Sequence, residues 1–192
     1  AQGRADEALA YSLRSHELQS QLHAPDDLRI AKALNNLGLR YDQLERYDEA
    51  LTDYRRALEI KEKKLGSDHP VLITTLMNIG NVARVQARYA DARAAYGRAL
   101  EISEDVFGPH HPETASLIDN IGITYYDKRE YEEALIRFEQ SLGIMEIAGE
   151  LGSAAAMRYR SHIASAERHL GHHDRAIAMS LEVLSYYRQT LG

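Results

Sequence analysis

The chain has 192 residues, a formal net charge of −6 and no cysteine, and 27% of its residues are charged. A mildly acidic chain with no run of basic residues is a poor candidate for nucleic-acid binding, which needs a clustered basic face. The lack of cysteine excludes disulfides and thiolate metal sites, and no apolar run approaches the roughly 20 residues of a membrane helix. With no signal peptide visible, we expect a cytoplasmic location and no membrane contact.

The first 27 residues are expected to contain one helix, over residues 3–22, which ends before Pro25. Its apolar spacing matches that of a segment 42 residues further on, where Ala5, Ala8 and Leu9 correspond to Tyr47, Ala50 and Leu51. We therefore interpret residues 1–27 as the second helix of a truncated repeat whose first helix is absent. On this interpretation the chain is a fragment of a longer protein.

Residues 28–69 are expected to form a pair of helices. Apolar residues spaced by three and four predict an amphipathic helix over residues 28–44 and another over residues 47–65. The short segment between the two helices leaves room only for a tight turn. The pair therefore has the helix–turn–helix plan.

Residues with known preferences for helix ends mark the boundaries of this pair. Asp26 or Asp27 can cap the first helix, and Gly66 is well placed just past the end of the second. Ser67 or Asp68 can cap the helix that follows, and Pro70 suits its first turn.

The same plan returns every 42 residues, and a fixed period without insertions indicates a repeat architecture. Its markers are Asn36-Leu37-Gly38, Asn78-Ile79-Gly80 and Asn120-Ile121-Gly122, each followed at fixed spacing by Tyr, Ala and a second aromatic residue. We assign repeat 1 to residues 28–69, repeat 2 to 70–111, repeat 3 to 112–153 and a degenerate repeat 4 to 154–192. The expected fold is all-α, with nine helices in one solenoid domain.

This order of Gly, Tyr, Ala and aromatic residue resembles the tetratricopeptide repeat. The 42-residue length and the link Leu65-Gly66 to His69-Pro70, repeated as Phe107-Gly108 to His111-Pro112, resemble the kinesin-light-chain branch of that family. The resemblance implies a right-handed superhelical solenoid whose first helices line a concave groove. It also implies a structural role for His69 and His111 in the turn.

The interiors of the helices carry further expectations. Glycine inside a helix costs roughly 1 kcal/mol relative to alanine, so we expect Gly38, Gly80 and Gly122 to allow close approach by alanines of the partner helix, namely Ala50, Ala92 and Ala134. The tyrosines and Phe138 are expected in the core. In repeat 4, Arg160 and Glu167 replace residues of the buried stripe, which indicates either an altered seam or a local ion pair.

On each first helix, the positions free of the packing stripe are expected to face the groove. One of them, two residues before the glycine, is Asn36, Asn78 or Asn120 in repeats 1 to 3, with His162 in the fourth place. An amide both donates and accepts hydrogen bonds, so a ladder of asparagines can hold the backbone of an extended peptide. The resemblance carries that role onto these three residues. The alternative is that they bond the neighbouring helix and shape the repeat.

The expected peptide-binding residues are Lys32, Asn35, Asn36, Leu39, Thr74, Asn78, Asn81, Arg84, Ser116, Asp119, Asn120, Ile123, Arg158 and His162, with Met77, Asp127, Ser161 and Ser165 beside them. Their few basic residues are interspersed with acids. They do not form the concentrated anion clamp with which tetratricopeptide co-chaperones grip a terminal carboxylate. We therefore expect a mixed-charge or internal peptide segment as the ligand.

Metal binding and catalysis find little support in the sequence. His169, His172 and His173 with Asp174 could form a weak site, but His173 aligns with the core-facing Tyr47 and is expected to pack. A metal site needs converging ligands held by further hydrogen bonds, so we expect no metal and no other cofactor. No glycine-rich phosphate loop occurs, and no Ser/His/Asp set lies in a strand–turn context. We expect no enzymatic activity.

The sequence thus predicts a protein-interaction module that binds an extended peptide or partner segment in a concave groove. Two alternatives stay open. The chain could be a structural or regulatory spacer, or the sensor arm of a larger signalling protein. It could also self-assemble weakly through its terminal helices. Their uncovered apolar residues are expected to include some of Ala5, Ala8, Leu9, Leu13 and Leu18 in the first helix, and Ile177, Leu181, Leu184, Tyr187 and Leu191 in the last.

Overall fold

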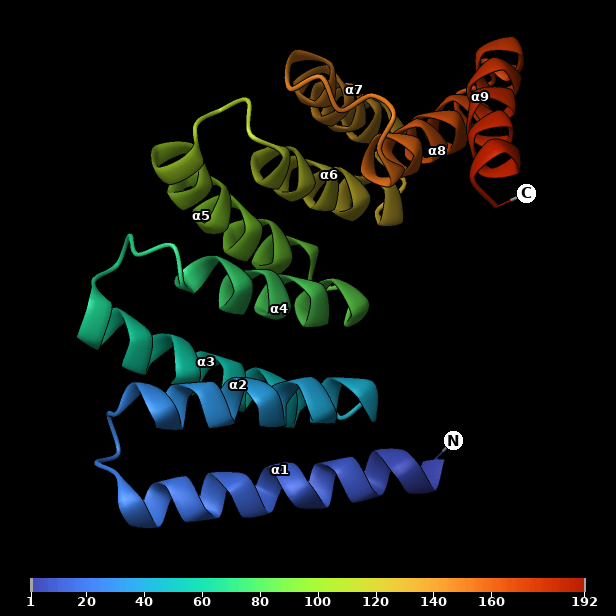
Figure 1. Ribbon diagram of the computed structural model, residues 1–192. Coiled ribbons are helices and arrows are strands. Elements are labelled where there is room, and N and C mark those ends of the chain that lie inside the picture. The colour runs from blue at the N-terminus through green and yellow to red at the C-terminus, as the bar shows by residue number, and fades with distance from the viewer. Residues whose placement is uncertain (1, 192) are drawn as a thin grey trace. The chain divides into compact units, whose positions relative to one another are not determined.

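The computed structural model describes the backbone of residues 2–191 and the side chains of residues 7–190, so Ala5 and Leu191 lie outside the described side chains. In this range the chain is all-α (Figure 1), which confirms the predicted fold class. The helices are α1 (Gln2–Leu22), α2 (Leu28–Gln43), α3 (Tyr47–Leu65), α4 (Leu72–Val85), α5 (Tyr89–Phe107), α6 (Pro112–Asp127), α7 (Tyr131–Ile147), α8 (Ala154–His169) and α9 (His173–Leu191). None of these helices is long and apolar enough to cross a membrane.

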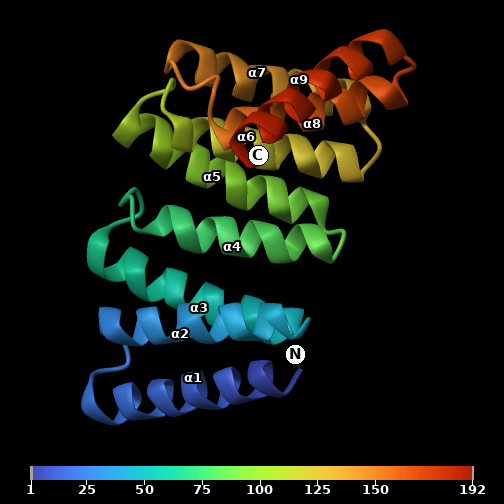
Figure 2. The ribbon, with the colours of Figure 1, turned by 45° about the vertical axis from the view of Figure 1, so that its right-hand side comes forward.

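The chain divides into two compact units, residues 1–95 (unit 1) and residues 96–192 (unit 2), with the division inside α5. In unit 1, α2 packs against α1 and α3, and α4 packs against α3. In unit 2, α7 packs against α6 and α8, and α9 packs against α8. Figures 1 and 2 show this order within each unit. Each helix therefore buries its apolar stripe mainly against its neighbours in the chain.

The core of unit 1 lies between α2, α3 and α4. One cluster joins α2 to α3 and consists of Ile30, Ala31, Leu34, Ala57 and Ile60. Another joins the first half of α3 to α4 and the start of α5, and consists of Ala50, Leu51, Tyr54, Ile79, Val82 and Ala95. Burying one leucine or isoleucine side chain contributes roughly 1.5–3 kcal/mol, so these contacts supply most of the stabilisation of the unit.

The core of unit 2 repeats this arrangement between α6, α7 and α8. One cluster consists of Ala115, Ile118, Ile144, Met145, Ala156 and Tyr159. The other is built on Ala134 and Phe138 of α7 with Ile163 and Ala166 of α8. Tyr54, Tyr96 and Phe138 are fully buried, as predicted, whereas Tyr47, Tyr89 and Tyr131 are half-buried. The expectation that the tyrosines lie in the core is wrong for Tyr11 and Tyr187, which are 71% and 40% exposed.

The glycines inside α2 and α6 allow close approach by aromatic rings. A Cβ atom added at Gly38 would lie 2.8 Å from Cε1 of Tyr54, and one added at Gly122 would lie 2.7 Å from Cε1 of Phe138. The ring reaches across the glycine from one turn further along the second helix. The nearest neighbours are therefore not the predicted alanines one turn earlier, Ala50 and Ala134.

The ends of the first helix pair follow the sequence closely. Asp27 caps α2, because its carboxylate accepts a hydrogen bond from the backbone N–H of Arg29 at 2.8 Å. Gly66 follows α3 with a φ of 97°, a left-handed conformation that glycine adopts without steric cost. Both predicted roles are confirmed.

The linker before the next first helix uses a different capping group from the one predicted. His69 Nδ1 accepts a hydrogen bond from the backbone N–H of Val71 at 3.2 Å, and α4 begins only at Leu72. His111 caps α6 in the same way, through the N–H of Glu113 at 3.1 Å. The structural role of these histidines is thus confirmed. The predicted N-cap of α4 at Ser67 or Asp68 is wrong, since the N-cap is Val71.

The two charges on the stripe of repeat 4 are paired locally. Glu167 is fully buried and binds both His172, at 2.5 Å, and Arg175. Arg160 pairs with Glu182 at 3.0 Å. A buried charge is costly unless it is paired, so these contacts explain how α8 tolerates the substitutions. Beside them His173 is exposed, which makes its predicted packing wrong.

A half-buried carboxylate in α3 makes the stability of the fold depend on pH. Burial raises the pKa of Asp53 to about 6, with a further contribution from Glu49. Its Oδ2 atom is buried and has no hydrogen-bond partner among the described residues. A carboxyl group whose pKa rises on folding stabilises the folded state while it is protonated. That stability is lost as pH rises from the unfolded pKa through about 6.

We expect Gly122→Ala to lower the free energy of unfolding by roughly 1–3 kcal/mol, because the new methyl group would overlap the ring of Phe138. Gly143→Ala is the matched control. Gly143 lies inside α7 with no atom within 4 Å of an added Cβ, so this change should stabilise by up to about 1 kcal/mol through helix propensity. Urea unfolding of the variants measures both effects. Equal effects at the two positions would contradict the ring-over-glycine packing.

We expect Asp53→Asn to raise the free energy of unfolding at neutral pH by about 1–2 kcal/mol, a value reduced for the partial exposure of the side chain. At about pH 3, where the carboxyl is protonated in both states, the gain should vanish. Asp68→Asn, on an exposed linker residue, should change little at either pH. Thermal unfolding across the pH range tests this, and a gain that does not depend on pH would rule the carboxyl out as its cause.

Candidate functional site

The three asparagines of the predicted ladder are at least partly accessible. Asn36 is exposed on α2, and Asn78 on α4 and Asn120 on α6 are half-buried. None of the three side chains forms a hydrogen bond with any residue in the described part of the chain. Each amide therefore offers a donor and an acceptor to an incoming group. The alternative role, as hydrogen-bonding links between helices, has no such contact to support it.

The remaining predicted residues of unit 1 have different surroundings. Lys32, Leu39 and Thr74 are exposed, and Asn81 and Arg84 are half-buried on α4. Asn35 is also half-buried, and its Oδ1 accepts a hydrogen bond from the hydroxyl of Thr75 at 3.2 Å. Asn35 therefore links α2 to α4 by a hydrogen bond. This is the structural role that the alternative hypothesis assigned to Asn36, Asn78 and Asn120.

Three of these residues line one pocket of about 390 Å³. It is bounded by α2, by the end of α3 and by the linker that follows, and its lining residues are Leu28, Lys32, Asn35, Asn36, Lys61, Leu65, His69 and Val71. Lys61 is half-buried, its ammonium donates to the hydroxyl of Thr75 at 2.6 Å, and burial lowers its pKa. The structure thus brings Lys32, Asn35 and Asn36 together with a second lysine.

Sequence reasoning missed Lys61 and His69 as lining residues. Lys61 lies on a second helix, outside the face expected to bind. A signal was present, however, because the equivalent residues 42 and 84 positions later are Ser103 and Met145, and both are buried. A lysine at a position that is otherwise buried identifies a place where repeat 1 departs from the common core.

In unit 2, the predicted residues Asp119 and His162 form a pair. Asp119 is only 1% exposed, and its Oδ1 lies 2.7 Å from Nδ1 of His162. The exposed Arg158 lies beside them, with Nε 3.9 Å from Oδ2 of Asp119. The imidazole also packs against Phe138, with ring centroids 5.1 Å apart. The buried carboxylate therefore positions the imidazole and is itself shielded from solvent.

His162 lines a smaller pocket of about 230 Å³ with Ile123, Tyr126, Asp127, Phe138 and Ser165. Ile123 and His162 are predicted site residues, and Ser116 and Asn120 lie half-buried on the same helix as Ile123. The pocket combines an aromatic wall with one oriented imidazole. It can accept an apolar group that carries a hydrogen-bonding atom.

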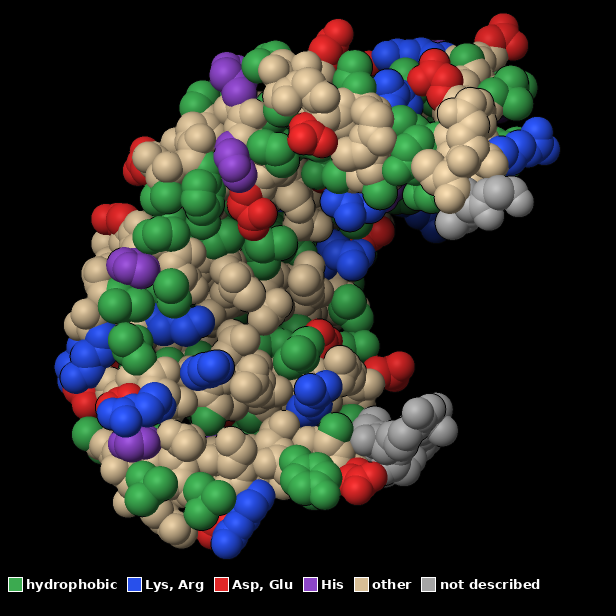
Figure 3. All heavy atoms as spheres, in the orientation of Figure 1, with side chains coloured by type: hydrophobic (Ala, Val, Ile, Leu, Met, Phe, Trp, Pro, Cys, Tyr) green, Lys and Arg blue, Asp and Glu red, His purple; other side chains and the backbone are tan. Residues whose placement is uncertain are grey.

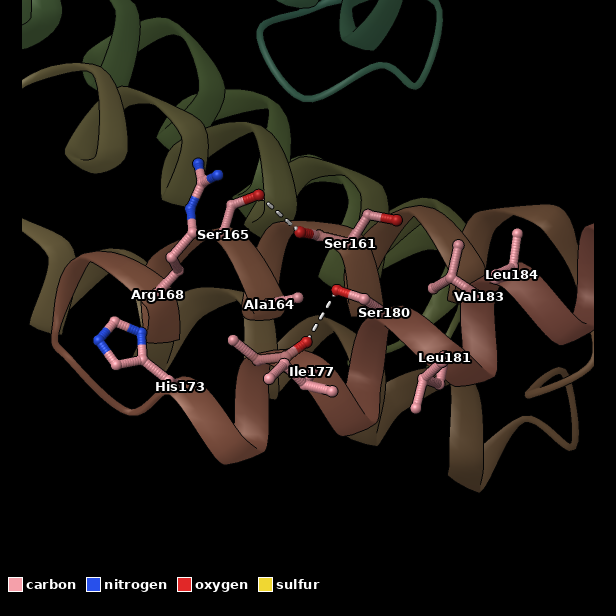
Figure 4. Close-up of a pocket in the computed structure, with 11 residues that line it drawn as sticks. Ser161, Ala164, Ser165, Arg168, His173, Ile177, Ser180, Leu181, Val183 and Leu184 are labelled. Carbon is pink, nitrogen blue, oxygen red and sulfur yellow. Dashed lines mark hydrogen bonds between the residues drawn. The ribbon is translucent and has the colours of Figure 1, made fainter.

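A third hollow lies between α8 and α9, with a volume of about 640 Å³. Figure 4 shows Ser161, Ala164 and Ser165 of α8 along one side and apolar residues of α9, among them Ile177 and Leu184, along the other. The hydroxyls of Ser165 and Ser180 donate to carbonyls of their own helices. The hollow therefore presents a mainly apolar surface.

The histidines near the end of α8 have other partners. The ring of His169 stacks on Tyr131 with centroids 4.4 Å apart, and His172 binds Glu167. Among the residues that the structure describes, no three side chains of histidine, aspartate or glutamate lie close enough to hold a metal ion.

Two tetratricopeptide repeat profiles match the sequence, one over residues 1–63, 43–96 and 71–147 and the other over residues 157–192. No curated protein matches it.

Solved structures with the same fold include BtubC (BKLC) from P. vanneervenii, with a TM-score of 0.85 at 20% identity over 100% of this chain and 76% of that one. A putative kinesin light chain of Podosopora anserina with nearly identical TPR-like repeats has a TM-score of 0.85 at 16% identity, over 99% and 90%. Aspartyl phosphate phosphatase F from Bacillus subtilis has a TM-score of 0.78 at 17% identity, over 97% and 49%. At these identities the likeness shows the fold alone.

The repeat profiles cover most of the sequence, and they agree with the helix pairs and with the rings that cover the repeat glycines. The chain belongs to the tetratricopeptide repeat family.

Proposed function

We propose that this chain is a protein-interaction module whose first helices bind an extended segment of a partner protein. Arrays of tetratricopeptide repeats are generally protein–protein interaction modules and are typically non-catalytic. The observation that carries the proposal is the set of unbonded amides at Asn36, Asn78 and Asn120. A polar side chain that the fold does not use is free to bond a ligand.

The surroundings of these asparagines support binding to a peptide backbone. Each lies two residues before the glycine of its helix, about 200° away around the helix axis at 3.6 residues per turn. The glycine faces the partner helix of the pair, so the asparagine points away from that contact. One such amide in each of repeats 1 to 3 suits the regularly repeating N–H and C=O groups of an extended chain.

A second proposed function, self-association, rests on the open face of α9. Ile177, Leu181, Leu184 and Tyr187 are 58%, 59%, 45% and 40% exposed. By the 42-residue period, Ile177, Leu184 and Tyr187 correspond to Leu135, Leu142 and Met145 of α7, which pack in the clusters that contain residues of α8. Leu181 corresponds to the exposed Glu139. An apolar helix face of this kind is a surface on which another helix can pack.

Charges on α9 favour a second copy of the chain as the partner of this face. Asp174 and Arg188 lie seven residues before and after Leu181, so all three share one side of the helix. Neither charge has an ion-pair partner among the described residues. An antiparallel pairing of two α9 helices about Leu181 would bring Asp174 of one copy close to Arg188 of the other.

We expect the double change Asn78→Ala and Asn120→Ala to weaken binding of a peptide selected by display against the chain by about 1–3 kcal/mol, because polar groups of the ligand would lose their partners. Thermal stability should change less than affinity. Asn35→Ala is the contrasting variant, since it breaks the bond from Thr75 and should lower stability. Calorimetric titration and thermal unfolding separate the two effects. Unchanged affinity with a large loss of stability would make the ladder asparagines structural.

We expect concentration-dependent association of the 192-residue chain, which Ile177→Glu or Leu181→Glu should reduce because a charge would replace buried apolar surface. Ile136→Glu is the matched control, since Ile136 on α7 is 60% exposed and lies outside the proposed interface. Sedimentation equilibrium measures the association, and circular dichroism checks helicity. A monomer at all concentrations would refute the interface, as would equal effects of the three variants.

A further inference from the structure

The pocket of unit 1 between α2, the end of α3 and the linker before α4 is lined mainly by hydrogen-bond donors. At its base, Lys61 donates to Thr75 at 2.6 Å, and the Thr75 hydroxyl donates onward to Oδ1 of Asn35 at 3.2 Å. The oxygen of Asn35 is thereby used, and its NH₂ group remains as a donor. The Lys61 ammonium keeps two further N–H groups, because a lysine carries three.

The other polar residues that line the pocket also offer hydrogen-bond donors. Lys32 is exposed and forms no hydrogen bond or ion pair within the described residues. His69 accepts from the backbone N–H of Val71 through Nδ1, so its proton is on Nε2, where it can be donated. The exposed amide of Asn36 completes the set and can both donate and accept.

None of the described residues that line this pocket is acidic. By contrast, the neighbouring Lys63 and Lys64 are paired with a carboxylate, since both bind Asp26, at 3.1 and 3.0 Å. Burial lowers the pKa of Lys61. Lys and Arg side chains are also prominent on the surface over unit 1 in Figure 3.

We infer that this pocket is an oxyanion site that takes a carboxylate group. Lys61 and Lys32 supply the charge, and Asn35 and His69 supply neutral donors. Leu28, Leu65 and Val71 form an apolar rim, so the group that fits is a carboxylate attached to an apolar stem. Its source can be an acidic side chain of a bound segment or a small free acid. The first source rests on the function proposed above, whereas the second does not.

The lysine from the second helix is central to this site. The ladder and the other predicted contacts all lie on first helices, whereas Lys61 reaches the pocket from the end of α3. At the equivalent position of repeat 3 the residue is Met145, which is 2% exposed. The change Lys61→Met therefore introduces a residue that the repeat accommodates, and it removes the charge together with the hydrogen bond to Thr75.

The test uses the 192-residue chain with labelled leucine and valine methyl groups, observed by NMR. Four probes are titrated in turn: the capped peptide acetyl-Gly-Leu-Glu-Leu-Gly-amide, its Gln counterpart, sodium acetate and inorganic phosphate. We expect the Glu peptide to shift the methyl resonances of Leu28, Leu65 and Val71, and the Gln peptide to leave them unchanged. Lys61→Met and Lys32→Met should each weaken this binding roughly tenfold, as expected for loss of one charge-assisted hydrogen bond.

Lys64→Met is the matched control, because Lys64 is on the same helix but binds Asp26 outside the pocket. It should leave the affinity unchanged. Lys32 is exposed, so its variant keeps the test valid even if Lys61→Met lowers stability. Circular dichroism of each variant confirms the fold.

The outcomes separate this inference from the proposed function. Shifts with acetate or phosphate but not with the Glu peptide, lost in both pocket variants, would support a site for a free anion and reject the acidic side chain as its source. Absence of shifts with every probe would overturn the inference, and so would equal losses in Lys61→Met and Lys64→Met. The asparagine double variant leaves the pocket lysines intact, so failure of one proposal does not imply failure of the other.

Discussion

The packing of an aromatic ring over a glycine sets the spacing within the helix pairs, and the proposed binding surface depends on it. Tyr54 lies over Gly38 and Phe138 lies over Gly122, at distances that leave no room for a Cβ atom. Once the glycine face of the first helix is fixed against its partner, the residue two positions earlier must point away. The same contact that stabilises the pair therefore orients Asn36 and Asn120 toward solvent.

Regular packing also makes the departures from the repeat informative. A side chain that differs from its counterparts at a core position must find a partner or line an opening, because buried polar groups are costly when unpaired. Glu167 finds His172 and Arg175 and becomes part of the fold. Lys61 donates to the hydroxyl of Thr75 and lies at the wall of a pocket. The first departure is satisfied by residues of the described chain, and the second is the group on which the proposed carboxylate site rests.

The two units present different polar groups on comparable helices. In unit 1, Asn35 and Lys61 are tied together through Thr75, and the pocket beside them is cationic. In unit 2, the residue equivalent to Asn35 is Asp119, which is buried against His162. A common backbone plan therefore presents polar groups that differ from repeat to repeat. If the proposed function holds, this variation is what would select one partner segment over another.

The sequence by itself determined the helices, their ends and the repeat, because these depend on local spacing and on residues such as Asp27 and Gly66 whose conformational preferences are strong. It also indicated which residues occupy equivalent positions on the first helices, since a 42-residue period transfers the geometry of one repeat to the next. Only the tertiary structure decided which groups meet. The ring of Tyr54 rather than Ala50 covers Gly38. The side chain that accepts a backbone hydrogen bond just before α4 is His69, not Ser67 or Asp68. Lys61 lines the same pocket as Lys32. These contacts depend on how far a side chain reaches between helices, which a periodic pattern along one chain does not contain.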